Sequence, residues 1–118
     1  MKRLLVSGAL ALLMGCFATR DLLTLPQAQT FTCRVSVGEA AAAITQAWAD
    51  HQAKTRITEH GETFRFALID KVTDHDGLAV RIWSEGGQTR IRYSAGDKRF
   101  LGGWEESPLL KLRTDGPR

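Results

Sequence analysis

One strand leads directly into one helix in the sequence Thr30-Phe31-Thr32-Cys33-Arg34-Val35-Ser36-Val37-Gly38-Glu39. Apolar and polar residues alternate up to Val35, and this period of two is typical of a half-buried strand. Ser36 and Glu39 then have the spacing of a capping box, in which a serine side chain caps the first turn of a helix. The pattern therefore predicts that strand gives way to helix at Ser36.

The predicted helix spans Val37–Ala53, because its apolar residues recur every three or four positions. These residues are Val37, Ala40, Ala41, Ile44, Ala47 and Trp48. This spacing places one apolar stripe along the helix. The alanines favour the helical conformation and allow close approach to a neighbouring sheet.

Four further strands are predicted after the helix, each ended by a turn or a loop. They are Lys54–Glu59, Glu62–Asp70, Leu78–Ser84 and Gln88–Ser94. Residues 96–104 form a predicted glycine-rich loop, and Ser107–Arg113 a short closing helix. The turn signals are His60-Gly61, the segment 73–77 and Gly86-Gly87.

This order of elements predicts an α+β fold. One helix covers the apolar face of a mainly antiparallel sheet of about five strands, which makes a two-layer sandwich. The strands follow in the order strand, helix, then four strands. The domain is expected to span residues 30–113, and residues 114–118 are expected to form a disordered tail.

Charge and cysteine content restrict the class of function. The chain carries 16 basic and 13 acidic residues, a net charge of +3, and two of the basic residues, Lys2 and Arg3, lie at its very start. The remaining chain is close to neutral, which argues against a nucleic-acid partner. Cys33 is expected to be buried, as free cysteines usually are.

The first sixteen residues have the layout of a secretory leader. Lys2 and Arg3 precede a short apolar run, Leu4–Met14, which is too short to cross a bilayer as a helix. The run ends in Leu13-Met14-Gly15-Cys16. This ending resembles the lipobox of bacterial lipoprotein signal peptides.

The resemblance implies cleavage between Gly15 and Cys16 and a diacylglycerol thioether on Cys16, with further acylation such as palmitate on the new amino group. Residues 1–15 would then be the signal peptide and residues 16–29 a tether to the membrane. Within the tether, Leu22-Leu23-Thr24-Leu25 is more apolar than a free linker, which leaves two positions open for it, on the domain or on the lipid surface. Two or three acyl chains hold a protein on a membrane stably. Because residue 17 is Phe and not Asp, we expect outer-membrane attachment facing the periplasm rather than the inner membrane.

The sequence supplies no catalytic residues, no metal site and no cofactor apart from the lipid on Cys16. Asp74-His75-Asp76 falls in a predicted turn, where such residues are chosen for turn geometry, and no glutamate completes a calcium loop. His51 and His60 lack a zinc motif, and no G-x-S-x-G elbow is present. Glu105-Glu106 are adjacent carboxylates, which point apart in most backbones. We therefore do not expect an enzyme.

The candidate partner-binding residues are basic or aromatic and lie on the last two predicted strands or just after them. They are Arg81, Trp83, Arg90, Arg92, Lys98 and Arg99. Tryptophan and arginine are enriched at binding hot spots. Two arrangements of Trp83 remain open at this point. Either it lies exposed in a contact surface, or the segment Ser107–Arg113 folds over it.

The expected function is that of a membrane-anchored accessory or adaptor that binds another envelope protein through its sheet or its last strand. Its layout is similar to that of small accessory lipoproteins of bacterial envelopes. One alternative is an inhibitor or exclusion lipoprotein, because the strand-borne cysteine in Thr30–Cys33 is similar to that of periplasmic lysozyme inhibitors. Another is binding of lipopolysaccharide, peptidoglycan or anionic lipid through a basic sheet face.

Overall fold

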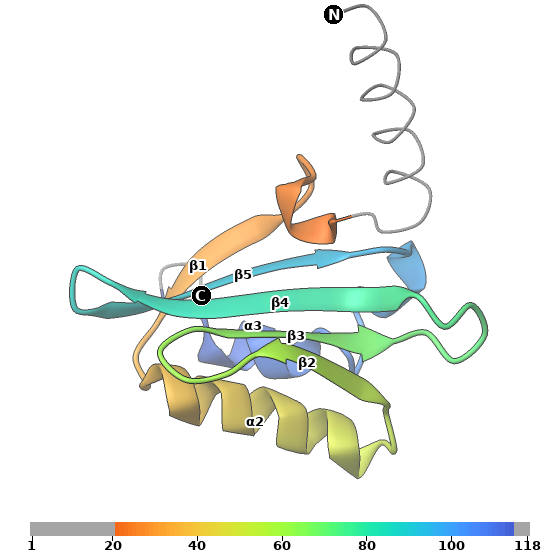
Figure 1. Cartoon of the computed structure of the whole chain (residues 1–118), viewed down its shortest axis with the longest axis horizontal. Helices are drawn as coiled ribbons and strands as arrows, with labels where there is room; N and C mark the ends of the chain where they lie inside the picture. Colours follow the sequence, from red (N-terminus) through yellow and green to blue (C-terminus); the bar gives the residue numbers. More distant parts are fainter. Residues whose placement is uncertain (1–20, 115–118) are drawn as a thin grey trace, which may run out of the picture.

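The computed structural model describes residues 21–114, which form one antiparallel five-stranded sheet with helices on one face (Figure 1). The strand order is β1-β5-β4-β3-β2. The elements are η1 (Leu22–Thr24), β1 (Gln29–Cys33), α2 (Val37–Asp50), β2 (Thr55–Glu59), β3 (Phe64–Ile69), β4 (Asp76–Glu85), β5 (Gln88–Ala95), η2 (Lys98–Phe100) and α3 (Ser107–Leu112). The prediction of an α+β sandwich with five strands is confirmed.

Helix α2 begins where the sequence predicts and ends earlier. The Ser36 hydroxyl accepts a hydrogen bond from the backbone N–H of Glu39 at 3.2 Å, as an N-cap does. The helix ends at Asp50 and not at Ala53, because Gln52 adopts a left-handed conformation with φ of 58°. The N–H groups of Gln52 and Ala53 then bond to carbonyls of the last turn, which is a Schellman ending.

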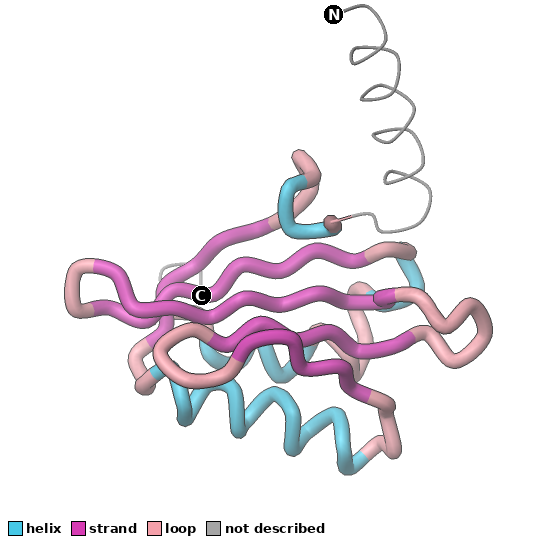
Figure 2. The backbone as a smooth tube through the Cα atoms, in the orientation of Figure 1, coloured by secondary structure: helices cyan, strands magenta, loops and turns pink. Residues whose placement is uncertain are grey.

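Figure 2 shows α2 lying along one side of the sheet as a second layer. The buried core residues lie between this layer and the sheet. Trp48 is fully buried on α2 and meets Phe66 of β3 edge to face, with ring centroids 5.6 Å apart. Leu109 of α3 is also fully buried there. Cys33 is 3% exposed in this layer, which confirms its predicted burial.

The opposite side of the sheet, called the outer face here, is partly covered by η1. Leu22 and Leu23 are buried against Ala67 of β3 and Ala79 of β4. Of the two positions left open for Leu22-Leu23-Thr24-Leu25, the structure shows packing on the domain, so this part of the predicted tether 16–29 is not a free linker. Residues 16–20 lie outside the described residues, as do the predicted leader 1–15 and most of the predicted tail.

The two sheet edges are β1 and β2, which corrects the expectation that the last strand is available for pairing. Strand β5 lies between β1 and β4, hydrogen-bonded to both. Thr114, predicted to be disordered, donates hydrogen bonds from its N–H and its hydroxyl to the Thr32 carbonyl, each at 2.9 Å. The C-terminal residues thus cover part of the β1 edge.

Candidate functional site

Four of the six candidate residues lie together on the outer face. In the register of the sheet, Arg81 of β4 stands directly opposite Arg92 of β5, and Trp83 stands directly opposite Arg90. Arg65 of β3 stands opposite Arg81 on its other side. Three arginines therefore form one row across three adjacent strands, in an arrangement where like charges repel.

Uncharged groups hold the side chains of Arg90 and Arg92 in place. Arg90 donates from a terminal guanidinium nitrogen to the Thr32 hydroxyl at 2.6 Å. Arg92 donates from Nε to the Leu23 carbonyl at 2.8 Å and from a terminal nitrogen to the Thr30 hydroxyl at 2.9 Å. Because these acceptors carry no charge, the hydrogen bonds fix the guanidinium groups and leave their positive charge uncompensated.

Trp83 and Arg81 form the exposed part of the site. The guanidinium of Arg81 lies 4.9 Å from the centre of the Trp83 ring, within the range of a cation–π contact. The indole N–H donates to a carboxylate oxygen of Glu85 at 3.2 Å. Trp83 is half-buried while Arg81 is exposed. Helix α3 lies on the α2 side of the sheet, so the alternative in which Ser107–Arg113 covers Trp83 is wrong.

We call Arg81, Arg90 and Arg92 the arginine cluster. Among residues 21–114 no ion pair joins the cluster to a carboxylate, whereas the neighbouring Arg65 pairs with Asp21 at 2.9 Å. Nε of Arg90 is buried and has no hydrogen-bond partner in the described part of the chain. A buried donor without a partner costs about 1–3 kcal/mol. The cluster therefore offers donors and charge to an anionic group from outside.

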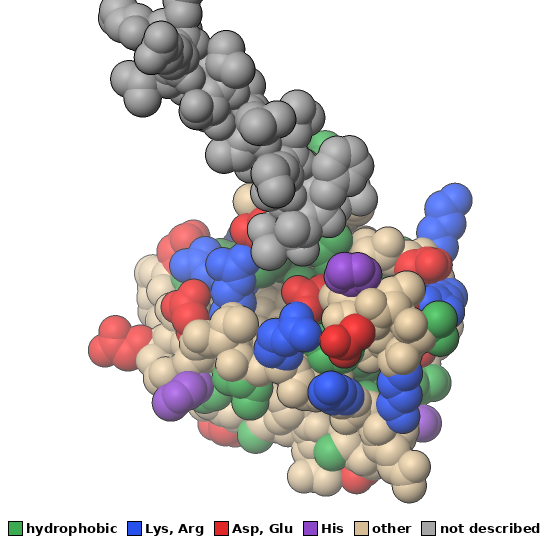
Figure 3. Space-filling model, turned by 45° about the vertical axis from the view of Figure 1, so that its right-hand side comes forward, with side chains coloured by type: hydrophobic (Ala, Val, Ile, Leu, Met, Phe, Trp, Pro, Cys, Tyr) green, Lys and Arg blue, Asp and Glu red, His purple; other side chains and the backbone are tan. Residues whose placement is uncertain are grey.

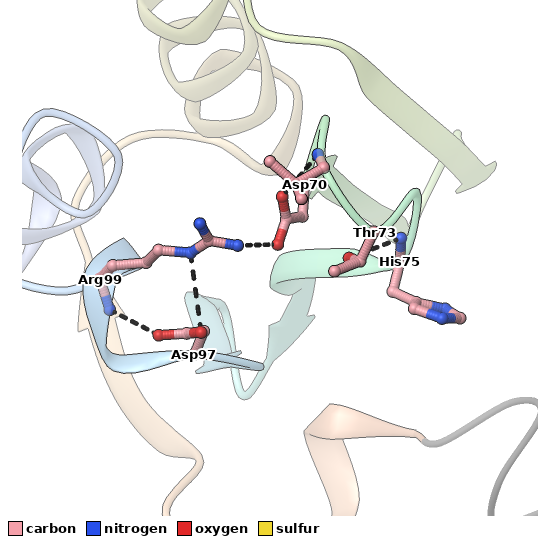
Figure 4. Close-up of polar contacts among 6 residues, drawn as sticks. Asp70, Thr73, His75, Asp97 and Arg99 are labelled. Carbon is pink, nitrogen blue, oxygen red and sulfur yellow. Dashed lines mark hydrogen bonds and ion pairs between the residues drawn. The ribbon is translucent and has the colours of Figure 1, made fainter.

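Lys98 and Arg99 lie apart from the cluster, which corrects the prediction of one basic surface. Both belong to η2, beyond the far end of β5 from Arg90. Figure 4 shows the Arg99 guanidinium between two carboxylates, bonded to Asp70 and paired with Asp97 at 3.6 Å. On the face shown in Figure 3, basic side chains likewise lie beside acidic ones. Arg99 thus has a structural role, in ion pairs with Asp70 and Asp97.

The adjacent glutamates, the cysteine and the turn aspartates singled out in the sequence have structural roles. Glu106 is buried and accepts a hydrogen bond from the Tyr93 hydroxyl, while Glu105 gives its backbone carbonyl to the indole N–H of Trp48. Burial raises the pKa of the Cys33 thiol, which disfavours the reactive thiolate. Asp74 and Asp76 of the predicted turn pair with Lys54 at 3.9 Å and Arg56 at 3.1 Å.

Two further observations concern metals and membranes. In the described range no group of three or more His, Cys, Asp or Glu side chains is placed to hold a metal ion. Between Asp21 and Thr114, no helix has both the length and the apolar character that a membrane span requires.

The sequence indicated the outward arginines but missed the groups that fix them. Thr30 and Thr32 alternate outward in the printed sequence, yet nothing local indicated that their strand would lie beside β5. The Leu23 carbonyl was not identified as a partner of Arg92, because the apolar character of its segment does not indicate which part of the domain it contacts. Searches for a matching family model, a similar curated protein or a similar solved structure found none.

Proposed function

We propose that this protein is a lipid-anchored, non-enzymatic accessory protein of the bacterial envelope that binds another envelope protein through the outer face of its sheet. The observation that carries the proposal is the group formed by Trp83 and the arginine cluster. It combines an aromatic ring with fixed guanidinium groups that have no counter-charge of their own.

The anchor and the site lie on the same side of the domain under this proposal. Cys16 precedes Asp21 by only a few residues, and the carboxylate of Asp21 pairs with Arg65 on the outer face. A chain extends at most about 3.3–3.6 Å per residue, so a lipid on Cys16 remains near that face. The partner is therefore met close to the membrane, at the periplasmic surface of the outer membrane.

The anchor is tested by Cys16→Ser. This variant should remain an unprocessed and unlipidated precursor, detected as a larger species by mass spectrometry of the intact protein. Normal cleavage and membrane attachment of the variant would remove the anchor from the proposal.

The binding role is tested by crosslinking in cells, followed by isolation of the protein and mass spectrometry of what it carries. Trp83→Ala and Arg81→Glu should remove one specific envelope protein from the crosslinked products. The chain offers matched controls in Trp104→Ala and Arg56→Glu. Trp104 stacks on His51, and Arg56 pairs with Asp76, away from the cluster. Both control variants should retain the partner.

Recovery of lipopolysaccharide or peptidoglycan in place of a protein would replace the adaptor role with glycan or lipid binding. Loss of the activity of a recovered enzyme upon binding would assign an inhibitor or exclusion role to the same surface. Equal recovery by the Trp83 and Trp104 variants would show that the outer face is not the contact surface.

A further inference from the structure

From the geometry of the arginine cluster we infer that the partner binds with an extended segment carrying acidic side chains at alternate positions. This inference rests on the proposed function and adds the chemistry of the partner. Guanidinium groups match carboxylates in shape and form two parallel hydrogen bonds with them.

The spacing of the cluster follows from the strand that carries it. Arg90 and Arg92 are two residues apart on β5 and point to the same face, where such neighbours lie about 6.6–6.8 Å apart. An extended segment presents its own alternate side chains at the same interval. Two carboxylates of that segment therefore reach the two guanidinium groups without distortion of either chain.

Preorganisation favours a geometrically defined ligand. The acceptors on Thr32, Thr30 and Leu23 hold Arg90 and Arg92, and the ring of Trp83 holds Arg81. Arginine side chains that are already fixed lose little rotamer freedom when a ligand binds. They therefore bind a ligand of matching geometry more tightly than flexible arginine side chains would.

The same observations disfavour an anionic lipid surface as the occupant. Segments that bind anionic lipid usually gather about four to eight lysines and arginines, whereas this cluster consists of Arg81, Arg90 and Arg92 alone. The described residues carry equal numbers of acidic and basic side chains, so they produce no long-range attraction to a negative surface. Glu85 and Asp21 flank the cluster and would be repelled by a continuous sheet of phosphates.

The test uses the full-length processed protein in vesicles of phosphatidylcholine and the peptide Glu-Thr-Glu-Thr-Glu-Thr-amide, labelled with fluorescein at its N-terminus, with binding measured by fluorescence anisotropy. The wild-type protein should bind this peptide and not its glutamine counterpart. Arg90→Gln and Arg81→Gln should each weaken binding about tenfold or more, because each removes charge-assisted hydrogen bonds. Arg81→Lys should lose less, and Arg56→Gln should bind as wild type does.

Circular dichroism melts of each variant separate lost binding from lost folding. Glycerol phosphate, a soluble phosphate headgroup, provides the second arm of the experiment as a competitor, because an anionic vesicle surface would repel the acidic peptide whatever the cluster binds. Unchanged peptide affinity in its presence supports the inference, whereas displacement of the peptide would assign the cluster to lipid phosphate and overturn it. Absence of peptide binding with a folded protein would also overturn it, even where crosslinking identifies a partner. Peptide binding without any crosslinked partner would instead refute the adaptor role, while the arginine cluster would still be a binding site for acidic segments.

Discussion

Glu106 is a buried carboxylate that joins the sheet to the segment between η2 and α3. It accepts a hydrogen bond from the Tyr93 hydroxyl at 2.5 Å and another from the backbone N–H of Gly102 at 2.8 Å. Tyr93 itself is 1% exposed in the core beside Phe31. Burial, and then the Glu106 carboxylate, raises the pKa of Tyr93 well above its usual value of about 10.

Tyr93→Phe should therefore lower the free energy of unfolding by about 1.5–3 kcal/mol at neutral pH, because it removes a bond to a charged group. Above pH about 10 the unfolded wild type ionises Tyr93 while the folded protein keeps the proton. The wild type then loses this stability as the pH rises, and the difference from Tyr93→Phe narrows. Denaturant titrations across the alkaline range measure both effects. A constant difference at all pH values would contradict this role for Tyr93.

Asp70 gives the opposite dependence on pH. Its carboxylate accepts a hydrogen bond from the Val72 backbone N–H at 2.9 Å and bonds to Arg99, and these contacts lower the pKa of Asp70. The stability that these contacts supply is fully present above the pKa of Asp70 in the unfolded chain, about 3.9. It is lost as the pH falls through the lowered pKa of Asp70 in the folded protein.

Asp70→Asn should accordingly be less stable than wild type at neutral pH and approach it in acid. Thermal melts over the acidic range provide the measurement. Asp97→Asn is the matched control, because the Asp97 side chain is 55% exposed and its 3.6 Å pair with Arg99 contributes little. A difference in melting temperature between Asp70→Asn and wild type that stays the same at every pH would rule out a stabilising charge at this position.

At the scale of single elements, α2 depends on its first turn. The Ser36 hydroxyl accepts from the Glu39 N–H and also donates to the Glu39 carboxylate at 3.0 Å. Ser36→Ala should lower the free energy of unfolding by about 1 kcal/mol, since it removes the cap. Ser36→Asp supplies another capping oxygen and should lose less. Denaturant titration of both variants checks this, and equal losses would show that the cap is not the cause.

Elements with a regular period could be predicted from the sequence. The alternation around Phe31 and the stripe that contains Ile44 and Trp48 appear in the structure as β1 and α2, because burial imposes the same periods on both. The end of α2 was misplaced by three residues. The Schellman ending at Gln52 uses a residue type that gives no glycine signal in the sequence.

Contacts between distant segments could not be predicted in this way. The outward direction of Arg90 and Arg92 follows from local alternation, but their hydrogen bonds to Thr32 and Thr30 depend on β1 lying beside β5. Local pattern does not specify which strands become neighbours. For a related reason, the apolar character of Leu22 and Leu23 made packing on the domain one expected arrangement, but it did not indicate which face of the sheet they would cover.

At the scale of the whole molecule, the two edge strands of the sheet are protected in different ways. Protection matters because an unpaired edge can pair with another chain. Strand β2 is short, charged and interrupted by a register shift between Ile57 and Glu59, features that discourage pairing. Strand β1 is instead covered near its end. Cys33 forms an isolated bridge with Arg113, and Thr114 bonds to the Thr32 carbonyl.

A chain ending at Leu112 should therefore lose about 1–2 kcal/mol of unfolding free energy and associate with itself as its concentration rises, because it exposes the β1 edge. The truncation also removes the Arg113 guanidinium, which lies 5.9 Å from the ring of Phe31. Denaturant titration and sedimentation velocity measure the two effects. The matched control ends at Thr114, keeps the contacts that Arg113 and Thr114 make with β1, and should remain as stable and as monomeric as the full chain. If both truncated chains behave alike, the edge is protected by another feature, and the C-terminal residues contribute only their own local contacts.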